Sequence, residues 1–194
     1  MNRSYTLCAQ RLIGALREAV HATPLAVPAA AAIAHGERAR RVAGVLEPFL
    51  EQPDLLSPAQ LEADPRSYRQ HLLHVEPGGA FSVVALVWLP GQQTAIHDHV
   101  SWCVVGTYRG QEEEVRYELV GTEGGSYLVP TDIAFSPTGA TAYLTPPGDI
   151  HAVRNATNDK VVSIHIYGAD VSACGGTSIR RCYDLPVRAP GHWH

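Results

Sequence analysis

The chain has 194 residues, of which 45% are hydrophobic and 18% charged, and its formal net charge at pH 7 is −4. This length is enough for one globular domain with a substantial core and too short for two domains of ordinary size. The sequence contains neither a long run of Lys and Arg nor about 18 consecutive apolar residues, so we expect no nucleic-acid partner and no membrane association.

Helical patterns occupy the first part of the chain. The N-terminus passes directly into an amphipathic pattern without a signal-like apolar segment, so we expect a cytoplasmic protein. The spacing of apolar residues predicts a helix over residues 6–20, and an Ala-rich stretch predicts a second over residues 29–50, broken near residue 44 or 48. Ser57 followed by Pro58 is typical of a helix N-cap and first turn, which predicts a short helix over residues 57–63.

Short β-like runs separated by Gly and Pro follow from residue 64 onward. They cover residues 68–75, 81–89, 95–99, 103–109, 113–120, 126–128, 141–144, 151–153 and 161–167. Such regularly spaced short strands predict a barrel or a sandwich, so the fold class is mainly β with N-terminal α-helices. We expect a single domain over residues 1–194, made of a helical region (1–63), a β-barrel (64–185) and a C-terminal tail (186–194).

His97 and His99 lie at positions i and i+2 of one of these runs. Side chains of a strand alternate between its two faces, so both imidazoles are expected on one side, where they can share a metal ion. Asp98 lies between them and should point to the other face of the strand. We therefore do not expect Asp98 to be a metal ligand.

Two segments of the sequence resemble the paired motifs of the cupin fold. The first reads Gly91-x5-His97-x-His99-x3-Cys103-x6-Gly110, and the second reads Pro146-Pro147-Gly148-Asp149-Ile150-His151-x3-Asn155. The chain departs from the cupin pattern in two places: Cys103 stands where cupins usually carry a glutamate ligand, and the leading glycine of the second motif is one residue out of place at Gly139. The alternative is three unrelated histidines, but two motifs in the right order are more specific than either alone.

The resemblance implies a cupin double-stranded β-helix barrel in which His97, His99 and His151 surround a metal ion. Three neutral imidazoles leave a divalent ion with its full positive charge, which favours an anionic ligand such as a thiolate. Three facial ligands on a six-coordinate ion leave three further positions, an arrangement used by non-heme Fe(II) oxygenases. Those positions suit a bidentate substrate together with O2.

A later strand, residues 161–167, alternates polar and apolar side chains. Ser163, His165 and Tyr167 share one face of this strand. Taken alone, the pattern also fits an edge strand with its polar face toward water. Together with the histidine motifs and Cys103, the Ser-x-His-x-Tyr pattern resembles the cysteine dioxygenase family of thiol dioxygenases, and the likeness covers roughly residues 67–183.

This resemblance implies roles for individual residues. His97, His99 and His151 match the iron ligands, and Ser163, His165 and Tyr167 match a hydrogen-bond relay beside the iron. Cys103 matches the position whose sulfur is joined to the tyrosine by a thioether bond in the animal enzymes. An ordinary buried thiol is the alternative for Cys103.

The residues that would bind the substrate's acid group differ from those of the cysteine-specific enzymes. Tyr68 and Gln70 match the substrate-binding strand, and Gln70 stands where those enzymes have an arginine that pairs with the substrate carboxylate. Gln70 therefore resembles the glutamine-type bacterial members, which prefer 3-mercaptopropionate or related mercapto-acids. Those members carry a compensating arginine where this chain has Gly176. Arg180 and Arg181 are the nearest candidates to replace it, or they are surface charges.

The leading functional hypothesis is an Fe(II)-dependent thiol dioxygenase that uses O2 to convert a small thiol acid, 3-mercaptopropionate-like or cysteine, into a sulfinic acid. Its partners are then the small thiol and O2, in a monomer or a small homo-oligomer. The alternatives are a three-histidine cupin oxygenase acting on a non-thiol chelator and a non-enzymatic cupin that binds a metal or a ligand.

Overall fold

The computed structural model describes residues 5–22, 31–123 and 125–189. Helix α1 covers Leu7–His21 and begins where the Thr6 hydroxyl accepts a hydrogen bond from the backbone N–H of Ala9 at 2.9 Å. Helix α2 covers Ala31–Leu46 and continues as a 3₁₀ turn over Glu47–Phe49. Pro48 lies within that turn, where its missing N–H would interrupt an α-helix. The part of the second predicted helix before residue 31 lies outside the described residues.

The predicted third helix is a 3₁₀ helix, Pro58–Leu61. Its N-cap is Ser57, whose backbone N–H donates to the Gln60 side chain at 2.9 Å. Among the described helices, none is long and apolar enough to cross a lipid bilayer.

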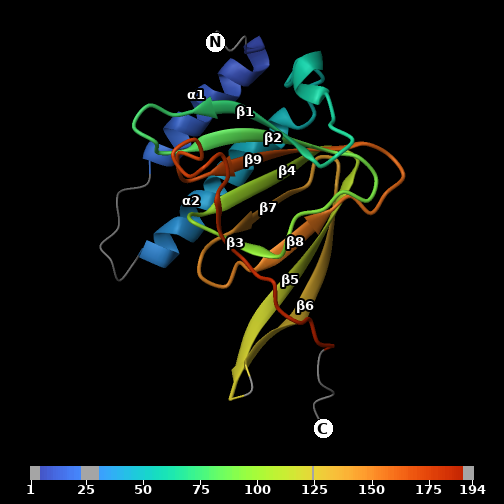
Figure 1. Ribbon diagram of the computed structural model, residues 1–194. Coiled ribbons are helices and arrows are strands. Elements are labelled where there is room, and N and C mark those ends of the chain that lie inside the picture. The colour runs from blue at the N-terminus through green and yellow to red at the C-terminus, as the bar shows by residue number, and fades with distance from the viewer. Residues whose placement is uncertain (1–4, 23–30, 124, 190–194) are drawn as a thin grey trace.

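In the described part of the chain, ten strands form two five-stranded antiparallel sheets (Figure 1). The strands are β1 Arg69–Val75, β2 Ser82–Trp88, β3 His97–His99, β4 Cys103–Arg109, β5 Gln111–Thr122, β6 Gly125–Pro137, β7 Thr141–Leu144, β8 His151–Arg154, β9 Val161–Tyr167 and β10 Ile179–Cys182. One sheet has the order β1-β2-β9-β4-β7 and the other β10-β3-β8-β5-β6. The predicted fold, a mainly β double-stranded β-helix with N-terminal helices, is confirmed.

The strand predictions were wrong at two places. The run predicted over residues 126–128 is the start of the 13-residue strand β6, which pairs with β5 in a long hairpin. Strand β6 continues past Pro130. The pairing register of β5 and β6 shifts at this proline, between Arg116 and Tyr117 on β5, and so accommodates it. Strand β10 was not predicted, since its four residues include two arginines and it exists only through pairing with β3.

Alternation along the central strands separates two clusters of buried side chains. On β9, Ile164 and Ile166 belong to the cluster formed with the helices, whereas Val161 and Tyr167 belong to the cluster inside the barrel. Helix α2 lies close to the sheet at Gly106, where a Cβ atom would lie 2.6 Å from the Leu46 side chain. The helices therefore cover the outer face of the first sheet, and the polar side chains of β9 face the space between the sheets.

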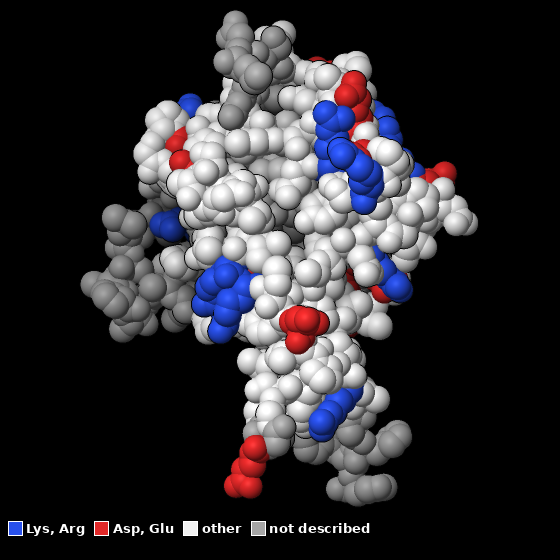
Figure 2. All heavy atoms as spheres, in the orientation of Figure 1, with Lys and Arg blue, Asp and Glu red and all other residues white. Residues whose placement is uncertain are grey.

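The hairpin of β5 and β6 extends beyond the body of the molecule (Figures 1 and 2). On the face drawn in Figure 2, the described Lys and Arg side chains and the Asp and Glu side chains lie in small separate groups.

Candidate metal centre

Three buried histidines meet between the two sheets. His97 and His99 extend from β3, and His151 begins the neighbouring strand β8, where it pairs with His97. One nitrogen of each ring lies within 4.8 Å of those of the other two. The ring centroids are separated by 4.9 Å (His97 to His99), 4.6 Å (His97 to His151) and 5.0 Å (His99 to His151). This spacing allows all three rings to bind one metal ion.

The orientation of the first two rings is set by acceptors behind them. The Nδ1 atom of His97 lies 2.9 Å from the carbonyl oxygen of Ala95, which can only accept a hydrogen bond. The Nδ1 atom and the backbone N–H of His99 both lie 3.0 Å from the same carboxylate oxygen of Asp149. Burial acts to raise the pKa of Asp149, but the hydrogen bonds from His99 have the larger effect. The pKa is therefore lowered from its ordinary value, and the carboxylate is ionised.

The third ring has the same arrangement. His151 Nδ1 lies 2.7 Å from Glu114 Oε1. Burial raises the pKa of Glu114, but the hydrogen bond from His151 and the charge of Arg116 outweigh it and the net pKa is lowered. The Nε2 atom of His151 is buried and has no hydrogen-bond partner within the described part of the chain. A bare, buried Nε2 whose opposite nitrogen is held by an acceptor is the form that binds a metal.

Two of the three histidines, His97 and His151, are also held in the neutral state. Burial lowers the pKa of His97 to about 3, with a further contribution from the neighbouring imidazoles. Burial also lowers the pKa of His151, against the opposing effect of Glu114. The residues present therefore fit a divalent metal ion, since they offer three imidazole nitrogens whose opposite ring nitrogens are held by acceptors.

Asp98 points away from the centre, as the alternation of side chains along β3 predicts. Its carboxylate accepts hydrogen bonds from Arg181 Nη2 at 2.9 Å and from the Tyr183 hydroxyl at 2.8 Å, and it also contacts the guanidinium of Arg180. Burial raises the pKa of Asp98, but these three partners outweigh it and hold the pKa well below its usual range. Arg180 and Arg181 therefore bind this structural carboxylate, and neither lines the pocket beside the histidines. The hypothesis that one of them anchors a substrate is not supported by this placement.

A chain of hydrogen bonds lies on the opposite wall of the pocket. The hydroxyl of Tyr167 lies 3.2 Å from His165 Nδ1, and His165 Nε2 lies 2.9 Å from the Ser163 hydroxyl. The indole N–H of Trp88 donates to the same Ser163 oxygen at 3.2 Å. Burial lowers the pKa of His165 to about 3 and raises that of Tyr167 well above its ordinary value, so both groups are neutral.

Cys103 lies directly beside Tyr167. The two residues are register partners on the antiparallel strands β4 and β9, so their side chains point to the same face. The Cys103 thiol is buried and its pKa is raised well above the ordinary value, first by burial and then by the charges of Glu114 and Glu112.

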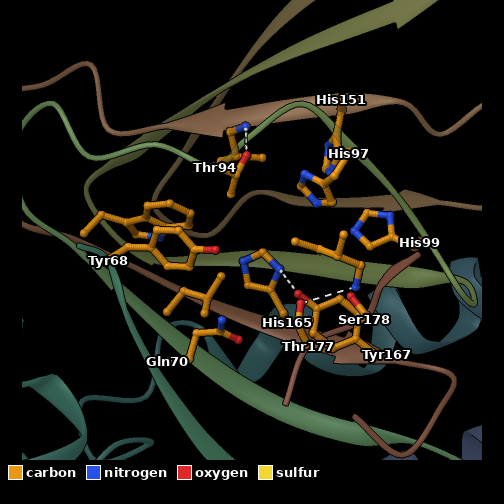
Figure 3. Close-up of a pocket in the computed structure, with 14 residues that line it drawn as sticks. Tyr68, Gln70, Thr94, His97, His99, His151, His165, Tyr167, Thr177 and Ser178 are labelled. Atoms are coloured by element: carbon orange, nitrogen blue, oxygen red, sulfur yellow. Dashed lines mark hydrogen bonds between the residues drawn. The ribbon is translucent and has the colours of Figure 1, made fainter. Parts of the chain in front are cut away.

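A pocket connects these groups (Figure 3). Tyr68 and Gln70 lie at one end, and the three histidines lie opposite His165 and Tyr167. Tyr68 stacks on Trp88 with ring centroids 4.5 Å apart. Neutral polar side chains of Thr94, Thr177 and Ser178 complete the polar lining. None of the 14 described residues that line the pocket is Lys or Arg.

This geometry agrees with the result of comparison with known families. A model described as cysteine dioxygenase type I matches residues 58–179, which is more than half of the chain and includes the three histidines and the hydrogen-bonded chain opposite them. The chain belongs to the cysteine dioxygenase type I family. Cysteine dioxygenase type 1 of Danio rerio is 26% identical over 113 residues, which are 57% of this chain and 56% of the relative. The match thus spans little more than half the length of that member of the cysteine dioxygenase family.

Two solved structures resemble the backbone over part of this chain. One is an uncharacterized conserved protein with a double-stranded β-helix domain from Klebsiella pneumoniae, 15% identical, with a TM-score of 0.45 over 61% of this chain and 92% of that one. Another is a Cupin 2 conserved barrel domain protein from Salinispora arenicola, 21% identical, with a TM-score of 0.42 over 62% of this chain and 91% of that one.

Sequence reasoning missed the acids that surround the histidines. Asp149 was visible only as part of the second cupin motif, and Glu112 and Glu114 are part of an acidic run that is typical of a solvated strand. The signal that could have found them is alternation: Glu112 and Glu114 share one face of β5, and Glu113, on the other face, pairs with Arg154. In this structure, that shared face points into the space between the two sheets, where Glu112 and Glu114 line a pocket together with His151.

Proposed function

We propose that this protein is an Fe(II)-dependent thiol dioxygenase that uses O2 to oxidise a small thiol acid to a sulfinic acid. The observation that carries the proposal is the chain Ser163–His165–Tyr167, which ends beside the three-histidine cluster. The rings of Tyr167 and His99 lie 6.0 Å apart between centroids. Membership of the cysteine dioxygenase family supports the same class of reaction.

The protein side chains have separate tasks in this proposal. Fe(II), when held by His97, His99 and His151, would supply a site for the substrate thiolate and electrons for the reaction with O2. Tyr167 holds a bound substrate or oxygen group through its hydroxyl, and His165 fixes the direction of that hydroxyl. The Ser163 hydroxyl in turn orients the imidazole of His165.

The other end of the pocket would hold the acid group of the substrate. Burial raises the pKa of Tyr68, so its hydroxyl stays protonated and can donate, and the Gln70 amide can also donate. Because the described lining contains no Lys or Arg, a carboxylate here would be held by neutral donors. Neutral donors tolerate a wider range of acids than a fixed guanidinium does, which favours 3-mercaptopropionate-like substrates over strict selection of cysteine.

The proposal is tested by anaerobic loading with Fe(II) and measurement of O2 uptake with two panels of compounds. We expect uptake and sulfinate formation with at least one of 3-mercaptopropionate, mercaptosuccinate and cysteine, and no uptake with diketones. Uptake with diketones alone would favour a three-histidine oxygenase for non-thiol substrates. No uptake with any compound, despite full iron occupancy, would favour a non-enzymatic cupin.

Gln70→Arg should change the preference among thiols. A guanidinium at this position would form charge-assisted hydrogen bonds with the substrate carboxylate, worth about 1.5–3 kcal/mol, or roughly a 10- to 100-fold gain in kcat/KM for 3-mercaptopropionate relative to cysteamine, a thiol without a carboxylate. Gln10→Arg, at an exposed position on α1, is the matched control. An unchanged ratio of the two kcat/KM values would place the acid group elsewhere in the pocket.

Cys103 and Tyr167 should become joined by a thioether during turnover. The bond between the Cys103 sulfur and a ring carbon of Tyr167 replaces the thiol hydrogen and one ring hydrogen, and O2 is the oxidant. Peptide mass analysis of enzyme that has turned over should therefore find one branched peptide lacking two hydrogen atoms. Recovery of an unlinked, fully alkylated Cys103 peptide would show that the thiol stays free.

A further inference from the structure

The buried carboxyl group of Glu112 lies at the far end of the hydrogen-bonded chain. Glu112 is only 4% exposed, and its Oε1 atom has no hydrogen-bond partner among the described residues. The hydroxyl of Ser163 and the indole N–H of Trp88 both interact with this carboxyl group. Glu112 is thus close to the serine that orients His165.

The surroundings of Glu112 place its protonation change near neutral pH. Burial raises its pKa to about 7, and the charge of Glu114 adds to this effect, whereas Ser163 and Trp88 oppose it. The other titratable groups close to it are Cys103 on β4, His151 on β8 and Tyr167 on β9. His165 lies one group further away, because Ser163 interacts with both Glu112 and His165.

The direction of the hydrogen bonds follows from counting donors at Ser163. A hydroxyl donates one hydrogen bond and accepts two, and the Trp88 indole N–H can only donate. When Glu112 is ionised it can only accept, so Ser163 donates to Glu112 and accepts from His165 Nε2–H. The Nδ1 atom of the neutral His165 is then without hydrogen and accepts from the Tyr167 hydroxyl.

Protonation of Glu112 allows the opposite direction. The carboxyl O–H can donate to Ser163, which then donates to His165 Nε2. The proton of His165 lies on Nδ1 in this form and is donated to the Tyr167 oxygen. The hydroxyl hydrogen of Tyr167 is thereby released from His165 and can be donated into the pocket.

We propose that Glu112 sets the direction of the Ser163–His165–Tyr167 chain and so decides whether Tyr167 can donate a hydrogen bond to a group in the pocket. This role rests on the proposed function, in which the Tyr167 hydroxyl donates to a bound substrate or oxygen group. The protons balance: the donating form holds one more proton than the other form. When Tyr167 gives its proton to a group in the pocket, each proton of the chain moves one position toward Tyr167, and Glu112 becomes ionised. Glu112 is thus a positioning residue that also stores a proton.

The test is the tautomer of His165, measured by nitrogen NMR on the full chain with labelled histidine, without metal and again with Zn(II) bound. His165→Gln identifies the signal. In the wild type, the ratio of the Nδ1–H to the Nε2–H form should fall as Glu112 ionises, with a midpoint near pH 7 in the metal-free protein. Glu112→Gln should make the ratio independent of pH, because an amide does not titrate in this range.

Two further variants complete the experiment. Glu118→Gln, an exposed position on the same strand, should retain the pH dependence. Ser163→Ala should abolish it although Glu112 remains, which keeps the test available if Glu112→Gln does not fold. The proposal is supported if the ratio depends on pH in the metal-free or the Zn(II)-bound wild type, and if both Glu112→Gln and Ser163→Ala abolish that dependence. The proposal would be overturned if the ratio stayed constant with pH in both the metal-free and the Zn(II)-bound wild type, or if its pH dependence persisted in Glu112→Gln. Because no turnover is measured, failure of the proposed oxidation of thiols would leave this result unaffected.

Discussion

His151→Ala should remove the bound metal and, with it, O2 uptake. The substitution deletes one of three nitrogen donors and leaves only His97 and His99 to hold the ion. Loss of a group that merely supports a metal ligand costs about 10- to 100-fold in metal affinity, so loss of the ligand itself should cost at least about 100-fold. The measurements are Fe(II) affinity by competition with a chelator and O2 uptake with the best thiol.

The control for this variant is His21→Ala, which removes an exposed imidazole at the end of α1. It should leave both Fe(II) affinity and turnover unchanged. If His151→Ala kept the wild-type affinity while folding normally, the ion would be held by other residues and the proposed centre would be wrong.

Tyr167→Phe should reduce kcat by about 100- to 1,000-fold, the usual effect of removing one directed donor from an active site. The ring and its packing remain, and only the hydroxyl that bonds to His165 is lost. Because the metal ligands are untouched, iron occupancy and the KM for the thiol should change little. Steady-state kinetics on samples of matched iron content measure this effect.

Tyr143→Phe is the matched control, since Tyr143 is 42% exposed on β7. It should leave kcat and KM as they are in the wild type. A kcat in Tyr167→Phe close to that of the wild type would mean that the hydroxyl has no part in the reaction, and the hydrogen-bonded chain would then be structural.

The sequence could predict those features that depend on local alternation. His97 and His99 share a face because they are two residues apart, and the same rule places Asp98 on the other side and aligns Ser163, His165 and Tyr167. The groups behind the histidines could not be predicted in this way. Asp149 reaches His99 across 50 residues and Glu114 reaches His151 across 37, so these contacts exist only once the sheets have formed.

The same reasoning explains why strand β10 was not predicted and why two roles were left open for its arginines. The arginines at 180 and 181 have no local feature that separates a substrate anchor from a structural ion pair. Pairing of β10 with β3 decides the matter, because it places both guanidinium groups next to Asp98. In the long hairpin, tertiary pairing with β5 similarly extends β6 past Pro130, which local propensity would treat as a strand end.

The most direct test of the proposed function is oxidation of the best thiol in isotopically labelled O2, followed by mass analysis of the product. A thiol dioxygenase should yield a sulfinic acid that carries two labelled oxygen atoms, at one molecule of O2 consumed for each thiol. A product without label, a disulfide, or a sulfinic acid with only one labelled oxygen would contradict the account.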